Sequence, residues 1–144
     1  MSIWLMLYYK VDKEIQDAPA KFRYHKNEPD DHRYFYEPGQ GPLVDLLMEK
    51  QSLPKVLDPA ILSKIKYMIR DEGKHDTKAM LAFATEFKNQ LEAKGDQMLV
   101  DMGYDLEWRN TRSKDVLIED LGNLIEFCEF GIKNKIKEFR HVFQ

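Results

Sequence analysis

Apolar positions in the N-terminal part of the chain follow the spacing of β-strands. Residues 3–11 are apolar on both alternating faces, which is typical of a strand covered on both sides in the middle of a sheet. Two further strand patterns, residues 21–26 and 31–36, flank the turn-forming residues 27–30 (Asn-Glu-Pro-Asp). This part of the chain is therefore predicted to form a central strand followed by a β-hairpin.

The loop of this hairpin determines which side chains share a face. Proline cannot adopt the positive φ that two-residue hairpin loops favour, so a four-residue loop of residues 27–30 is expected. With that loop, His25 lies opposite His32. The face expected to pack inward carries Phe22, Tyr24, Arg33 and Phe35. The other face carries Arg23, His25, His32 and Tyr34.

Helical patterns follow the hairpin. Helices are predicted at residues 43–51 and 58–73, where Pro42 and Pro59 suit first-turn positions. Asp76 suits the N-cap of a third helix that Gly95 closes. Its apolar stripe comprises Met80, Leu81, Ala84, Phe87 and Leu91. The alternation of polar and apolar positions over residues 104–108 predicts one more strand.

The longest helix is predicted over residues 114–143, where apolar side chains recur every three or four positions. Phe127 and Phe130 lie off this stripe, which indicates a helix packed on two sides, either inside the fold or in a homo-oligomeric contact. Its acids precede its bases, which complements the helix dipole. An RNA-binding basic tail is the alternative interpretation of the same bases.

These elements together predict an α+β fold. We expect a small antiparallel or mixed sheet of about four strands, packed against several helices, with a long C-terminal helix. The length of 144 residues fits a single globular domain, residues 1–144.

Composition and charge narrow the functional classes. A single cysteine, Cys128, excludes an internal disulfide framework and a Cys-rich zinc site, and favours a reducing, cytoplasmic location. The N-terminal residues lack the features of a secretory signal and are too short an apolar run for a membrane span, so no membrane association is expected. The net charge of −3 argues against nonspecific nucleic-acid binding and suits an acidic protein that binds a basic partner.

Residues 22–36 hold the densest mixture of aromatic, acidic, basic and histidine side chains. Opposed His25 and His32 suit a general acid/base pair, with Arg23 holding a phosphate and Tyr34 positioning a substrate. The same histidines suit metal ligation, but a metal site needs three or four ligands, so no metal and no cofactor is predicted. A solvated edge hairpin explains these residues without any site.

The chain contains no nucleophile elbow, no H-E-x-x-H and no dinucleotide-binding fingerprint, which favours binding over catalysis. The leading hypothesis is a small acidic cytoplasmic protein that occludes a macromolecular partner, as immunity proteins, antitoxins and phage or bacterial inhibitors do. The expected partner is a protein rather than a nucleic acid. The predicted contact residues are Asp30, Asp31, Tyr34 and Tyr36.

Two alternatives remain open. One is a small hydrolase of a nucleic acid or nucleotide that uses the His25 and His32 pair. The other is a homo-oligomeric structural subunit that associates through the C-terminal helix.

Overall fold

The computed structural model describes residues 5–27, 30–39, 72–101 and 114–143, and the structural statements below concern these residues. Five strands form one antiparallel sheet of order β2-β3-β1-β5-β4. The elements are β1 (Leu5–Val11), β2 (Arg23–Asn27), β3 (Asp31–Gly39), β4 (Glu72–Asp76), α3 (Thr77–Lys94), α4 (Asp96–Asp101), α5 (Lys114–Lys133) and β5 (Glu138–Phe143).

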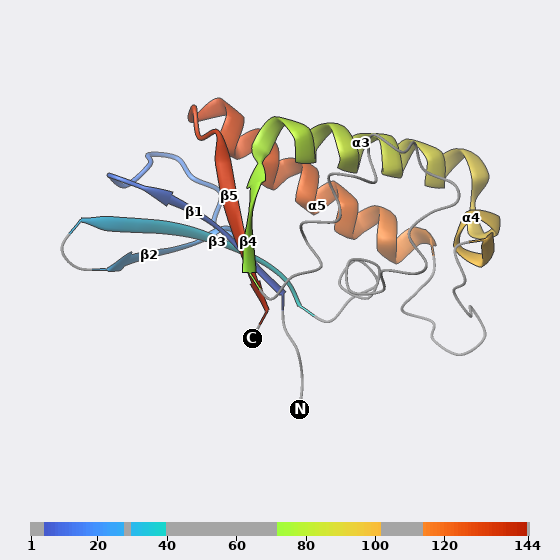
Figure 1. Cartoon of the computed structure of the whole chain (residues 1–144), viewed down its shortest axis with the longest axis horizontal. Helices are drawn as coiled ribbons and strands as arrows, with labels where there is room; N and C mark the ends of the chain where they lie inside the picture. Colours follow the sequence, from blue (N-terminus) through green and yellow to red (C-terminus); the bar gives the residue numbers. More distant parts are fainter. Residues whose placement is uncertain (1–4, 28–29, 40–71, 102–113, 144) are drawn as a thin grey trace.

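The architecture has a layer of helices on one side of the sheet. Helix α5 packs against the sheet, and α3 lies alongside α5 (Figure 1). The predicted α+β class is confirmed, with an antiparallel sheet of five described strands in place of about four. The predicted central position of β1 is also confirmed, since β1 pairs with β3 on one side and β5 on the other.

Aromatic packing joins the sheet to α5. The ring of Tyr9 on β1 stacks on Phe127 of α5 with the ring centroids 4.3 Å apart, and its hydroxyl donates a hydrogen bond of 2.8 Å to the Phe127 carbonyl oxygen. Phe139 of β5 meets both rings edge-on. Helix α5 approaches this closely because residue 131 is glycine: a Cβ there would overlap the Tyr9 ring.

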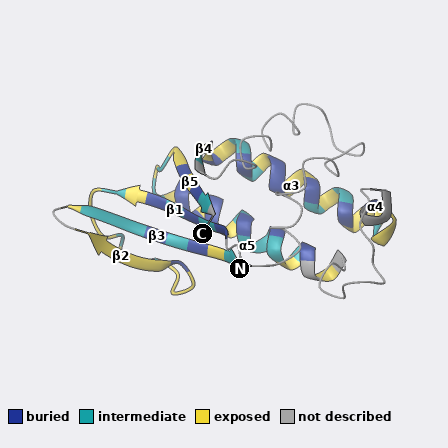
Figure 2. Ribbon diagram, turned by 60° about the horizontal axis from the view of Figure 1, so that its bottom comes forward, coloured by how far each residue is buried: buried dark blue, intermediate teal, exposed yellow. Residues whose placement is uncertain are grey.

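Burial follows the alternation of the strands (Figure 2). On β1, Leu5, Leu7 and Tyr9 are fully buried beneath the helices, while Met6 and Tyr8 on the other face are half-buried. The strand was predicted to be covered on both sides, so this prediction is wrong for the described part of the molecule. None of the described helices covers the second face of the sheet, which is called the open face below.

The predicted hairpin register is wrong by one residue. The observed pairs include Asn27 with Asp31, His25 with Arg33 and Arg23 with Phe35, which leaves residues 28–30 as the connection. Such a one-residue slip moves each side chain of one strand to the other face relative to its partner. The slip is favoured because it buries Tyr34 beneath the helices, where its hydroxyl accepts a hydrogen bond of 2.7 Å from the Ile15 amide.

The predicted C-terminal helix is too long. Helix α5 ends at Lys133, and residues 138–143 form strand β5, which pairs with both β1 and β4. Lys135 adopts a positive φ of 60°, and the Ile136 amide donates to the Gly131 carbonyl oxygen at 2.8 Å. This left-handed residue reverses the chain direction without the glycine that usually marks a helix end.

Helix α3 follows its predicted boundaries. The Asp76 carboxylate accepts a hydrogen bond from the Ala79 amide at 2.8 Å, and Gly95 ends the helix. Of the predicted helix at residues 58–73, the structure describes only the end, and there residues 72–76 form strand β4. The predicted helix at 43–51 and strand at 104–108 lie outside the described residues.

The two glycines of α5 provide a matched test of the packing. We expect Gly131→Ala to lower the free energy of unfolding by about 1–3 kcal/mol, the usual cost of overpacking a filled core. Gly122→Ala meets no atom within 4 Å and should raise the free energy of unfolding by up to about 1 kcal/mol through helix propensity. Urea unfolding followed by circular dichroism measures both changes, and shifts of the same sign would contradict the close approach of α5 to Tyr9.

Candidate functional site

The predicted contact tyrosines lie in the core. Tyr34 and Tyr36 are only 1% and 8% exposed, so the structure contradicts their prediction as surface anchors. The Tyr36 ring meets Phe127 at 5.7 Å, and desolvation by burial raises the pKa of its hydroxyl. Both residues therefore stabilise the packing of β3 on α5.

The predicted histidine pair is not formed. His25 shares a face with Arg33, whereas His32 points to the opposite side of the hairpin and pairs with Lys26. There the Tyr24 hydroxyl lies 2.5 Å from Nδ1 of His32, and the two rings stack with centroids 5.8 Å apart. The four residues predicted to share a face are also separated. Arg23 lies on the same face as His25, whereas Tyr34 lies on the same face as His32.

The predicted acidic residues have separate environments. Asp30 lies exposed in the turn. Asp31 is on the open face, where Nε and Nη2 of Arg33 donate to its Oδ2 at 3.0 Å and 2.8 Å. This hydrogen bonding holds the pKa of Asp31 below its usual range. Asp31 therefore orients Arg33 on a face whose other charged side chains are mostly cations.

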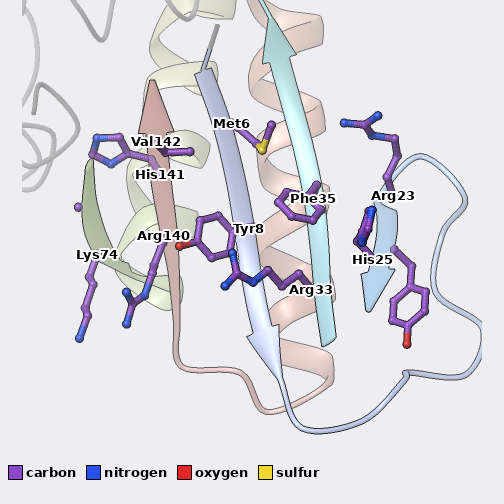
Figure 3. A pocket seen from close by; sticks show the side chains of 12 residues that line it. Met6, Tyr8, Arg23, His25, Arg33, Phe35, Lys74, Arg140, His141 and Val142 are labelled. Carbon is purple, nitrogen blue, oxygen red and sulfur yellow. The ribbon is translucent and has the colours of Figure 1, made fainter. Parts of the chain in front are cut away.

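A broad depression of about 680 Å³ occupies the open face of the sheet. Side chains from all five strands line it (Figure 3). Tyr8 and Phe35 lie near its centre, with Lys74 and Arg140 toward one side and Arg23 and His25 toward the other (Figure 3). We call this surface the open-face depression.

One line of paired residues crosses the whole sheet. Arg23 pairs with Phe35, Phe35 with Tyr8, Tyr8 with Arg140, and Arg140 with Lys74. In an antiparallel sheet, directly paired residues point to the same face. We call these five residues the five-strand row, in which two aromatic rings are flanked by cations on both sides.

Like charges face each other across the strands of the depression. Lys74 pairs directly with Arg140, and in the neighbouring line Arg33 pairs with Lys10. Directly opposed cations destabilise a sheet. Arg33 has its partner in Asp31, and Arg23 forms an ion pair with Glu37. Lys74 and Arg140 form no ion pair within the described ranges, so their positive charges are available to a ligand.

Arg33 also contacts the aromatic rings of the row. Its guanidinium carbon lies 5.1 Å from the Tyr8 ring centroid, a cation–π contact. Tyr8 and Phe35 are themselves 5.7 Å apart at a tilt of 38°. With Asp31 fixing the guanidinium, Arg33, Tyr8 and Phe35 form a partly exposed platform of planar groups.

Sequence reasoning missed most of the five-strand row. Residues 138–143 were assigned to a helix and Lys74 to no strand, so no alignment of Lys74, Arg140 and Tyr8 was expected. The alternation of Phe139, His141 and Phe143 with polar or smaller residues was the available signal for β5.

A second cluster lies within the core between β4 and β5. Nε2 of His75 lies 2.6 Å from Nδ1 of His141, and both side chains are buried. Burial, together with the neighbouring His141, lowers the pKa of His75 to about 3. Burial therefore favours the neutral form of His75, and the hydrogen bond needs an unprotonated nitrogen on one of the two rings.

The described side chains include no group of three or more His, Cys, Asp and Glu residues placed to hold a metal ion. Among the described helices, none has the length and apolar character needed to cross a bilayer. No protein-family model matches the chain, and searches of curated proteins and of solved structures find no significant match. The open-face depression is therefore the candidate functional site.

The buried histidine gives a pH dependence of stability. His75 titrates near pH 6.5 when unfolded but near pH 3 when folded, so its stabilisation is complete above pH 6.5 and is lost as the pH falls. We expect His75 to contribute a slope of up to about 1.4 kcal/mol per pH unit between about pH 6 and pH 4.5. His75→Gln should reduce this slope in urea unfolding, and His25→Gln, which also removes a histidine but at an exposed position, is the matched control. Equal slopes in both variants would contradict the assignment.

Proposed function

We propose that the chain is a binding protein that covers an anionic macromolecular partner with the open face of its sheet. The observation that best supports this function is the direct pairing of Lys74 with Arg140 in the open-face depression. This pairing costs stability in the free protein, and an anion seated between the two cations would offset the cost.

The proposal keeps the class expected from the sequence and changes the contact surface. The acidic contact was expected around Asp30 and Asp31, together with Tyr34 and Tyr36. The tyrosines are core residues, and Asp31 is neutralised by Arg33. The positive open face favours an anionic partner over the basic one, because complementary potentials steer association and fix register.

The net charge of −3 does not oppose this proposal. Net charge averages over the whole surface, whereas a partner responds to the local potential of the patch that it meets. The open-face depression concentrates Arg23, Arg33, Lys74 and Arg140 with His25 on one side of the molecule. The acids that balance them include Glu86 and Glu92 on α3, in the helical layer.

The hydrolase alternative loses its geometric basis. It required His25 and His32 to converge on one substrate, and the observed register places them on opposite faces of the hairpin. The homo-oligomeric alternative stays a prediction. Phe127 and Phe130, which suggested it, are buried within the chain against Tyr9, Phe22 and Tyr34.

Retention on immobilised heparin tests the proposal, because heparin is a polyanion without aromatic groups. We expect the wild-type protein to be retained at low salt and to elute as salt rises. The double variant Lys74→Glu with Arg140→Glu should lose retention. The matched control, Lys78→Glu with Lys94→Glu on exposed positions of α3, changes the net charge equally and should be retained as the wild type is.

Two results would contradict the proposed function. One is a wild-type protein that flows through at low salt. The other is equal loss of retention in both double variants, which would attribute binding to net charge rather than to the open-face depression.

A further inference from the structure

The five-strand row combines cations with exposed planar groups, and this combination narrows the partner class. We propose that the row binds a single-stranded nucleic acid, with bases stacking on Phe35 and on the Tyr8–Arg33 pair and phosphates contacting the cations at either end. This inference rests on the proposed function and specifies its ligand.

The order of residues along the row fits a polymer that offers both planar bases and charged phosphates. Phe35 and Tyr8 occupy the middle of the row, Arg23 lies at one end, and Arg140 and Lys74 lie at the other. With strands about 4.8 Å apart, the four spacings from β2 to β4 span roughly 19 Å. A single strand laid across the sheet would place bases on the central rings while its backbone continues to the cations on both sides.

The central groups are suited to stacking. Phe35 and Tyr8 are half-buried, so each is anchored in the sheet and still presents surface to the depression. Arg33 adds a guanidinium over Tyr8, and Asp31 holds it there through two hydrogen bonds. Aromatic rings and arginine planes on a sheet surface are the groups on which unpaired bases stack.

The rings and cations of the row together favour a single-stranded nucleic acid over other anionic partners. In a duplex the bases are already stacked on each other, so the rings of the row would gain little contact. An acidic peptide without aromatic residues offers carboxylates for Lys74 and Arg140 but no rings for Phe35 and Tyr8. An unpaired nucleic acid engages both kinds of side chain, because every nucleotide carries a base that can stack and a phosphate that can pair with a cation.

Fluorescence anisotropy with labelled oligouridylate and oligothymidylate tests the inference. Probes of about eight nucleotides lie within the range of ~4–16 nucleotides that one single-strand-binding fold occupies. We expect both probes to bind in a salt-dependent manner, more tightly than a duplex of the same length and more tightly than polyglutamate. The ribose and deoxyribose probes show whether the 2′-hydroxyl contributes.

Two substitutions at residue 35 isolate stacking from packing. Phe35→Leu keeps an apolar side chain but removes the ring, and should weaken binding about 5- to 150-fold, which corresponds to ~1–3 kcal/mol for one stacked base. Phe35→Tyr keeps the ring and should bind as the wild type does. Thermal unfolding of both variants establishes that they are folded, so a loss of binding in Phe35→Leu alone is a loss of stacking.

The outcomes distinguish the inference from the proposed function. Equal binding of single strands, duplexes and heparin, unaffected by Phe35→Leu, would overturn stacking and leave the anionic-partner function standing. Preference for polyglutamate over both oligonucleotides would overturn the inference in favour of an acidic protein partner. Absence of binding to every polyanion, heparin included, would overturn both.

Discussion

The rest of the structure depends on how Tyr9 seats against α5. Its ring lies against Phe127 and over the bare backbone of Gly131, and its hydroxyl bonds to a helix carbonyl. These contacts fix the distance and direction of α5 relative to the central strand. Helix α3 then packs along α5, and the strands on both sides of β1 bury their inner residues under the same layer. With the described helices all on this side, the other face of the sheet is left to carry the candidate site.

Local signals in the sequence predicted the elements that local chemistry determines. Asp76 and Gly95 bound helix α3 because a carboxylate cap and a glycine of positive φ act within one turn of the helix. The hairpin register depends on distant contacts instead. Loops of three and four residues are both compatible with the turn sequence, and the choice follows from the Ile15 and Asp120 backbone groups that meet the Tyr34 and Tyr36 hydroxyls. Neither partner can be recognised from the hairpin sequence.

The missed strand β5 has a different cause. Phe139 and Phe143 are four residues apart, as on a helix, and also lie on one face of a strand, so both periods fit the same apolar residues. Helix α5 ends at Lys133, and the chain turns at Lys135, where a positive φ occurs without the glycine that usually marks such a turn. The wrong hairpin register and the failure to predict β5 explain why the candidate site was not predicted. The five-strand row exists only when the β2–β3 hairpin and β5 have their observed registers.

The opposed cations of β4 and β5 also connect occupancy of the open face to the mobility of the sheet edge. Strand β4 lies at the edge of the described part of the sheet and pairs there with β5, and repulsion between Lys74 and Arg140 weakens that pairing. The strand leads directly into α3, whose first amide, that of Thr77, bonds to the Lys137 carbonyl oxygen just before β5. A bound anion would therefore slow local opening of the β4–α3 junction. Slower amide hydrogen exchange at this junction would therefore indicate that an anion occupies the open face.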